Sequence, residues 1–260
     1  MARGKAELLG ADLGIVGFGP PDPLTPFDND EWLQRLGTLP LFAQPGERFM
    51  YTTASNILGA LIARVEGKSF GEVMAERIFG PLGMKATGFF VPPDKLDRLV
   101  TAYRPKDGGL EVWDDPRTGG WSRPPKFEQG DGGLASTADD YLAFARMLLA
   151  GGTAGGRQLL SLDSVKAMTT NHLTPEQCEG GVDILGEGNG WGYGMSVAVE
   201  ETPNGSPEGS IGWTGGFGSK WESDPRRGLT TILLTQREWD GPKPAPIFDA
   251  FEQGARRLAD

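Results

Sequence analysis

The stretch that decides the fold reads Pro45-Gly46-Glu47-Arg48-Phe49-Met50-Tyr51-Thr52-Thr53-Ala54-Ser55-Asn56-Ile57-Leu58-Gly59-Ala60-Leu61-Ile62-Ala63-Arg64-Val65-Glu66. After a turn at Pro45-Gly46, apolar residues from Ala54 to Val65 recur at the three- and four-residue spacing of one helix face. Thr52 or Thr53 can cap the start, and Gly67 stands where a left-handed C-terminal residue belongs. The stretch therefore predicts a helix over 54–65 with Tyr51 directly before it.

Further helices are expected on both sides of this stretch. Ser69 and Glu72 form a capping box for a second helix, which should end at Gly80-Pro81. Ser136 and Asp139 form another box, for a third helix that reaches residue 151. Apolar spacing predicts two more helices over 28–36 and 247–258, and the segment 92–133 is rich in loop-forming residues.

The last third of the chain carries strand patterns. Strands are expected over 191–199, 210–213, 217–223 and 229–235, and the turn Asp224-Pro225-Arg226-Arg227-Gly228 joins the last two as a hairpin. Helices followed by consecutive strands predict the α+β class with an antiparallel sheet. We expect one domain over 1–260, in which 1–190 is mostly helix and loop and 191–260 holds the sheet strands and the C-terminal helix.

Composition excludes several functions. Lys+Arg is 25 against Asp+Glu 35, a net charge of −10, and an acidic surface repels nucleic acid. One cysteine, Cys178, allows no intramolecular disulfide, and one histidine, His172, cannot build a Cys/His zinc site. No apolar run is long enough to span a membrane or to form a signal-peptide core. We expect a soluble cytoplasmic protein with no metal, cofactor, nucleic-acid or membrane partner.

Three short motifs have structural as well as functional interpretations. Gly67-Lys68-Ser69-Phe70-Gly71 matches the nucleophile motif G-x-S-x-G, but a helix precedes it, Ser69 already caps the next helix, and His172 is the only candidate base. Gly215-Gly216-Phe217-Gly218 lacks the lysine of a phosphate loop. Trp213-Thr214-Gly215-Gly216, considered alone, is an ordinary turn into a hairpin, and Tyr51 alone is a packing aromatic.

Taken together and in order, five segments resemble the serine β-lactamase-like superfamily, in particular class C β-lactamases, D-alanyl-D-alanine carboxypeptidases and family VIII carboxylesterases. The resemblance runs from about residue 8 to the C-terminus. The segments are 45–64, Glu76-Arg77-Ile78-Phe79-Gly80-Pro81-Leu82-Gly83-Met84, Gly132-Gly133-Leu134-Ala135-Ser136-Thr137-Ala138-Asp139-Asp140, Gly212-Trp213-Thr214-Gly215-Gly216-Phe217-Gly218 and Leu233-Leu234-Thr235-Gln236.

The resemblance implies a β-lactamase/transpeptidase-like fold and a serine hydrolase that acts through an acyl-enzyme. Tyr51 matches the family tyrosine that manages the proton, and a nearby ammonium group is expected to lower its pKa. Thr53 stands where many members have the asparagine of Tyr-x-Asn. Trp213-Thr214-Gly215 falls on the Lys-Thr-Gly or His-Thr-Gly position, and Gly216 would supply a backbone N–H to the oxyanion hole.

Substrate class follows from Trp213 in the same way. A cation at this position helps β-lactamases and peptidases to hold the substrate carboxylate, and an indole cannot do so. The resemblance therefore favours a neutral small-molecule ester as the substrate, with β-lactam and peptide amides as the alternatives.

The family nucleophile motif Ser-x-x-Lys is missing from the chain. Among Ser55, Ser69, Ser122, Ser136, Ser161, Ser164, Ser196, Ser206, Ser210, Ser219 and Ser223, none has Lys three residues later. The family places this motif upstream of the region where the chain begins. We therefore expect a fragment or an inactive relative, without activity alone. The alternatives are a non-catalytic binding protein that retains the cleft and an α/β-hydrolase that uses Ser69 and His172.

An N-terminally incomplete fold also predicts exposed surfaces. The strand over 229–235 should lack a neighbour, and the stripe over 54–65 should be uncovered. We expect an N-terminal complementing segment or self-association to cover them, unless residues 1–18 fold back over the sheet edge.

Overall fold

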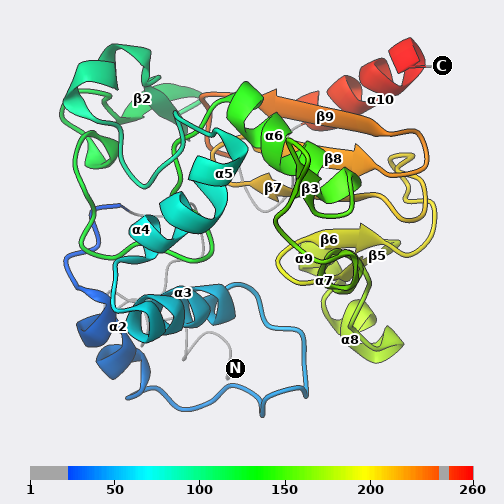
Figure 1. The fold of residues 1–260 in the computed structure, drawn as a ribbon, viewed down its shortest axis with the longest axis horizontal. Helices are drawn as coiled ribbons and strands as arrows, with labels where there is room; N and C mark the ends of the chain where they lie inside the picture. The colour runs from blue at the N-terminus through cyan, green and yellow to red at the C-terminus, as the bar shows by residue number, and fades with distance from the viewer. Residues whose placement is uncertain (1–22, 240–245, 260) are drawn as a thin grey trace.

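A five-stranded antiparallel meander forms the C-terminal part of the molecule (Figure 1). The computed structural model describes residues 23–239 and 246–259. Within them the strands follow chain order across the sheet, so the predicted α+β class is confirmed. They are β5 (Asn189–Trp191), β6 (Ser196–Ala198), β7 (Ile211–Gly215), β8 (Ser219–Asp224) and β9 (Leu229–Leu234).

Two helices, α6 (Ala138–Leu149) and α10 (Ile247–Ala259), cover opposite faces of this sheet. Side chains alternate between faces along a strand. On β8, Trp221 packs against Tyr141 of α6, with ring centroids 5.6 Å apart, while the next residue, Glu222, contacts Arg256 of α10 at 2.7 Å. The main core lies on the α6 side and contains Ala145, Met147, Leu148, Val165, Met195, Val197, Ile211 and Trp221.

The N-terminal helices form a separate region, in which α3 (Thr53–Glu66) follows α2 (Asn29–Leu36) (Figure 1). Gly67 ends α3 with φ 65°, as predicted. This helix buries only its small and polar residues, which are Asn56, Gly59, Ala60 and Ala63. Four of its large apolar side chains are exposed in the described part of the chain, as expected for an uncovered stripe: Ile57, Leu58, Leu61 and Val65, whereas Ile62 is half-buried.

The second predicted helix does not stop at Gly80-Pro81. It runs from α4 (Phe70–Met74) through the π-helical η1 (Ala75–Phe79) into α5 (Gly80–Leu82), and Gly83 ends it in the left-handed conformation. Proline lacks an N–H and its ring clashes with the carbonyl four residues earlier. The wider π turn before Pro81 relieves that conflict, and the helix therefore continues for one more turn.

Two other sequence predictions are wrong in detail. The strand predicted over 191–199 is two strands, because the chain reverses at Gly192–Gly194, where Gly192 N–H donates to Met195 O. The cap of α6 is Thr137, which accepts from Asp140 N–H, rather than Ser136. Ser136 Oγ instead shares a hydrogen bond with Thr87 Oγ1 at 2.8 Å.

The segment predicted as loop contains a hairpin that the sequence analysis missed. Its turn residues Asp107 and Gly108 both have positive φ, and Asp-Gly is a strong hairpin signal. The hairpin consists of β1 (Ala102–Lys106) and β2 (Gly109–Asp114). The remaining elements are η2 (Pro93–Arg98), η3 (Gly120–Ser122), β3 (Thr153–Ala154), β4 (Arg157–Gln158), α7 (Leu162–Met168), α8 (Pro175–Gly180) and α9 (Val182–Leu185).

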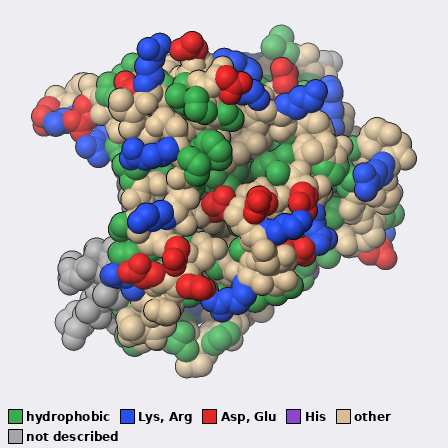
Figure 2. All heavy atoms as spheres, turned by 60° about the vertical axis from the view of Figure 1, so that its left-hand side comes forward, with side chains coloured by type: hydrophobic (Ala, Val, Ile, Leu, Met, Phe, Trp, Pro, Cys, Tyr) green, Lys and Arg blue, Asp and Glu red, His purple; other side chains and the backbone are tan. Residues whose placement is uncertain are grey.

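The outer edge of the sheet is β9, which among the described residues pairs with β8 alone, as expected. Gln236, two residues after the end of β9, contacts β1: its backbone O accepts a hydrogen bond from Tyr103 N–H at 2.7 Å. The predicted cover by residues 1–18 lies outside the described residues. Within the described ranges, no helix has the length and apolar character needed to cross a membrane. On the face in Figure 2, acidic and basic side chains are interspersed around apolar patches.

Candidate active site

The structure joins the two principal predicted site residues. Tyr51 stands just before α3, and Trp213 lies in β7, 162 residues later. The indole Nε1–H of Trp213 donates to the phenol Oη of Tyr51 at 2.8 Å. The segment around residue 51 and the Trp-Thr-Gly segment therefore face each other across one site, although no local pattern connects them.

Aromatic rings surround this hydrogen bond. The ring of Trp191, at the end of β5, lies 4.6 Å from that of Trp213 and 5.9 Å from that of Tyr51, edge-on to both. Phe49 contacts Trp191 from the other side at 5.6 Å. Edge-to-face packing of this kind holds rings in fixed orientations. The four side chains form an apolar wall, hereafter the aromatic wall, with one polar atom pair at its centre.

Electrostatics around Tyr51 differ from the expectation. The pKa of its phenol is raised, chiefly because burial disfavours the charged phenolate, and the carboxyl of Asp131 adds to the rise. The hydrogen bonds from Trp213 and Thr52 lower it in part. The predicted ammonium group is not among the described residues that affect this pKa. In the chain as described, Tyr51 is therefore a neutral phenol at neutral pH.

The remaining predicted site residues lie at the ends of the same elements. Thr53 is the first residue of α3 and is half-buried. Thr214 is opposite Lys220 in the ladder, so strand alternation turns it to the α10 face, away from Trp213. Thr53 therefore lies close to Tyr51 in the chain, whereas the side chain of Thr214 lies on the opposite face of the sheet from that of Trp213.

The peptide between Gly215 and Gly216 has a fixed direction. Gly215 C=O accepts from Gly218 N–H at 2.9 Å, within the turn between β7 and β8. In a trans peptide the N–H points away from the preceding carbonyl. The N–H of Gly216 is therefore turned out of the β7–β8 turn. A Cβ at Gly215 would overlap Ser219 Oγ unless that hydroxyl rotates.

A profile of the family described as Beta-lactamase matches residues 6–250. The chain belongs to this family. It is 38% identical over 253 residues to Protein Rv1367c of Mycobacterium tuberculosis, covering 88% of this chain and 61% of that protein. It is 29% identical over 260 residues to Esterase EstB of Burkholderia gladioli, covering 90% of this chain and 61% of that protein.

Solved structures agree with this assignment. The structure titled "EstCE1, a hydrolase with promiscuous acyltransferase activity" superposes with a TM-score of 0.71 at 25% identity, over 89% of this chain and 62% of that one. The β-lactamase/transpeptidase-like fold is thereby confirmed. The chain spans about three fifths of the length of these Beta-lactamase family relatives.

The alternative nucleophile in this Beta-lactamase family chain is already engaged. Ser69 caps α4 in a complete capping box with Glu72, as the structural interpretation of the motif predicted. His172 stacks on Tyr193 with centroids 4.3 Å apart, and its Nε2 lies 2.7 Å from Ala167 O. Ser69 and His172 therefore do not form a catalytic pair.

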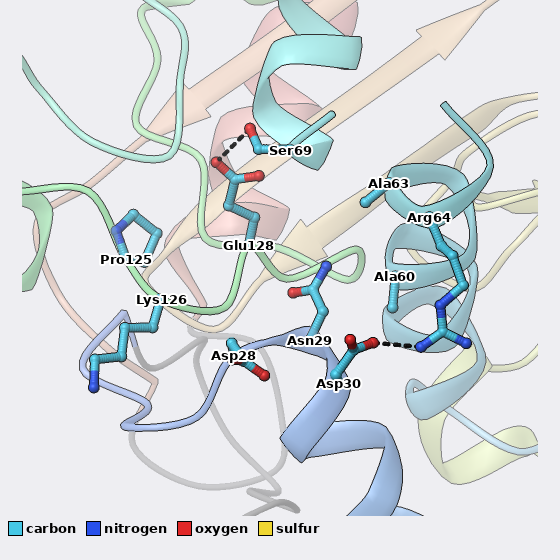
Figure 3. Close-up of a pocket in the computed structure, with 10 residues that line it drawn as sticks. All are labelled: Asp28, Asn29, Asp30, Ala60, Ala63, Arg64, Ser69, Pro125, Lys126 and Glu128. Carbon is cyan, nitrogen blue, oxygen red and sulfur yellow. Dashed lines mark hydrogen bonds and ion pairs between the residues drawn. The ribbon is translucent and has the colours of Figure 1, made fainter. Parts of the chain in front are cut away.

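A cavity of about 360 Å³ lies apart from the aromatic wall; of the candidate catalytic residues it is lined by Ser69 alone, and neither Tyr51 nor Trp213 lines it (Figure 3). Glu128 reaches Ser69 Oγ at 3.4 Å across it, and Arg64 pairs with Asp30 at its rim. Arg64 and Asp30 are thus an ion pair at this cavity, whereas Glu128 accepts hydrogen bonds from the uncharged groups Ser69 Oγ and Gly71 N–H. In the described ranges, no cluster of three His, Cys, Asp or Glu is placed to hold a metal.

Sequence reasoning missed Trp191 and Asp131. Trp191 opens a predicted strand and belongs to no motif. Asp131 stands directly before Gly132-Gly133, at the border of a segment that carries the resemblance. Its position beside that segment was the one available signal.

Proposed function

We propose that this chain forms the tyrosine side of a serine ester hydrolase site, and that a segment outside these 260 residues supplies the serine and lysine. The hydrogen bond from Trp213 to Tyr51 carries the proposal, because it brings together the two segments that the resemblance assigns to opposite walls of one site. Membership of the Beta-lactamase family and the similarity to Esterase EstB support hydrolysis of esters.

In the proposed reaction, the serine hydroxyl attacks the ester carbonyl, and the ester C–O bond breaks to leave an acyl-enzyme. The lysine supplied with the serine accepts the hydroxyl proton during the attack, Tyr51 protonates the leaving alcohol, and the lysine then returns its proton to the Tyr51 phenolate. Water then repeats the attack and releases the acid. Gly216 N–H, turned out of its turn, would stabilise the oxyanion.

The aromatic wall supports a neutral substrate. Phe49, Trp191 and Trp213 offer apolar contact area and no cation for a substrate carboxylate. We therefore propose a small-molecule ester, rather than a β-lactam or peptide, as the substrate. The lone cysteine, which allows no intramolecular disulfide, supports a cytoplasmic location.

The second candidate is a binding protein that keeps the cleft without the chemistry. It is favoured by one observation: no serine of the chain is followed by lysine three residues later. The two candidates differ in whether supplying the nucleophile restores activity.

The experiment compares the chain alone with a fusion that adds the Ser-x-x-Lys segment of a relative. The chain alone should neither hydrolyse a p-nitrophenyl ester nor be labelled by a serine-reactive phosphonate, since the oxyanion hole without its nucleophile gives little rate. The fusion should do both. Tyr51→Phe in the fusion keeps the ring and removes the hydroxyl, and should lower kcat/KM by about 10²-fold or more.

Three results would count against the proposal. Labelling of one serine in the isolated chain would show a different nucleophile. Full activity of the Tyr51→Phe fusion would show that another group moves the proton. A folded fusion without esterase activity would favour the binding protein.

A further inference from the structure

The start of α3 lacks a cap from its own sequence. Thr52 is the N-cap residue, yet its side chain makes no capping hydrogen bond, and the first turn contains no Asp or Glu. Its Oγ1 instead donates to Asp131 Oδ2 at 3.2 Å, 79 residues away in sequence. A negative charge at a helix N-terminus is stabilised by the helix dipole. Asp131 therefore brings to α3 the carboxylate that its sequence omits.

The backbone of Asp131 is held against the same turn of α3. Its N–H donates to Oδ1 of the buried Asn56 at 3.2 Å. The preceding residue, Gly130, packs so closely on the helix that a Cβ there would overlap Ser55 O. Because close approach of two backbones requires glycine at this point, the carboxylate is placed by the main chain on both sides.

The charge of Asp131 is not neutralised in the described part of the chain. Its Oδ1 is buried and has no hydrogen-bond partner among those residues. Burial raises the pKa of this carboxyl, while Thr52 and Asn56 lower it in part. Burying a carboxylate oxygen without a hydrogen-bond partner lowers the free energy of unfolding. The position of Asp131 therefore reduces the stability of the fold.

The carboxylate of Asp131 is bound to the residue that follows Tyr51, through the hydrogen bond from Thr52 Oγ1. Its charge also raises the pKa of Tyr51, after the larger effect of burial. The rings of Trp191 and Trp213, which contact the ring of Tyr51, carry no charge.

We propose that Asp131 is a positioning residue for Tyr51, which anchors the Tyr51-Thr52 corner to the first turn of α3 and so fixes the phenol for proton donation. This inference rests on the proposed function, because it presumes that Tyr51 transfers a proton. A neutral phenol gives its proton to the leaving alkoxide: the phenol O–H bond breaks as the alcohol O–H bond forms. The proton released earlier by the attacking hydroxyl is held by the lysine of the proposed function and then passes to the phenolate, so the step is balanced.

The test titrates Tyr51 in the isolated chain by NMR of ¹³Cζ-labelled tyrosine. Tyr51→Phe identifies its signal among the four tyrosines. Asp131→Asn keeps the shape of the side chain and removes its charge, so the pKa of Tyr51 should fall toward its ordinary value. Asp140→Asn is the matched control, since Asp140 is a part-buried carboxylate that accepts from Ala86 N–H and Thr87 Oγ1 elsewhere. It should leave the pKa of Tyr51 unchanged.

An unchanged Tyr51 titration in folded Asp131→Asn, or an equal shift in Asp140→Asn, would overturn the proposal. If Asp131→Asn does not fold, Asp131→Ser provides the decision, because it also removes the charge and its smaller side chain is easier to accommodate in the buried corner. The pKa of Tyr51 should then fall in Asp131→Ser, and no fall in the folded variant would overturn the proposal.

These titrations need no substrate. Failure of the proposed function, seen as full activity of the Tyr51→Phe fusion, is therefore distinguishable from failure of the positioning role. In the active fusion, Asp131→Glu should restore the pH profile that Asp131→Asn shifts. If the pH profiles of the Asp131 variants differ only as far as their melting temperatures differ, Asp131 has a merely structural role, and the proposal is overturned.

Discussion

Helices α3 and α6 carry equally clear apolar stripes, and the fold treats them in opposite ways. In α6 the stripe packs on the sheet, and Leu148 is 3% exposed. In α3 the packed face consists of Gly59, Ala60 and Ala63, whereas Leu61 is 52% exposed. Helical spacing therefore identifies an apolar face of a helix, but it does not show whether another element of the tertiary structure covers that face.

The largest expected effect is a difference in stability between matched leucines. Leu148→Ala should lower the free energy of unfolding by about 2–5 kcal/mol, because it removes buried contacts and leaves a cavity. Leu61→Ala should cost about 0.5 kcal/mol or less, as for other exposed positions. Urea denaturation followed by circular dichroism measures both. An equal cost would mean that the α3 stripe is covered in solution.

A second prediction asks what covers α3. Exposed apolar patches above a few hundred Å² are uncommon in monomers, so the purified chain should self-associate in a concentration-dependent way. Leu61→Glu should shift it toward monomer in size-exclusion chromatography with light scattering. Val112→Glu, which changes a 54% exposed valine on β2, is the matched control and should have no such effect. A wild-type monomer at high concentration would contradict the prediction.

The smallest expected effect concerns α10, which buries the charged Glu252 as well as the apolar Phe248. Glu252 is 1% exposed, accepts from Thr231 Oγ1 at 2.8 Å and lies 3.5 Å from Lys220 Nζ. Its pKa is raised, first by burial and then by repulsion from Glu222. The stability it contributes is fully present below its unfolded pKa of about 4.3 and is lost as pH rises through the folded value.

Glu252→Gln carries no such loss. The difference in unfolding free energy, variant minus wild type, should therefore become more positive between about pH 4 and neutrality. Urea denaturation across this pH range measures it, with Glu200→Gln at an exposed site as control. A difference that does not change with pH would show that burial of Glu252 imposes no charge penalty.

Local signals in the sequence were sufficient for much of the fold. The α3 helix, its Gly67 terminus and the β8–β9 hairpin were all predicted and confirmed. The missed β1–β2 hairpin was also encoded locally, in Asp107-Gly108. The errors at Pro81 and Ser136 arose where a π turn and a contact with Thr87 overrode the local preference.

For the candidate site, the sequence supplied Tyr51 and Trp213 only through a resemblance of separate segments, and their catalytic roles stay predictions. Their hydrogen bond could not be read from the chain because 162 residues separate them. The ring of Trp191, which packs edge-on against both, and the carboxylate of Asp131, bound to Thr52, belong to no periodic pattern. Each became part of the site only when β5 and the loop before α6 were packed in place.

By itself, the sequence determined which segments are helices and strands, where several of them end, and that no serine is followed by lysine at the family spacing. These properties depend on residues within one or two turns of each other, so the local chain encodes them. The tertiary structure alone decided that α3 turns its glycine and alanines inward and that a distant carboxylate sits at its N-terminus. Both depend on how closely two backbones approach, since Gly130 against Ser55 leaves no room for a side chain.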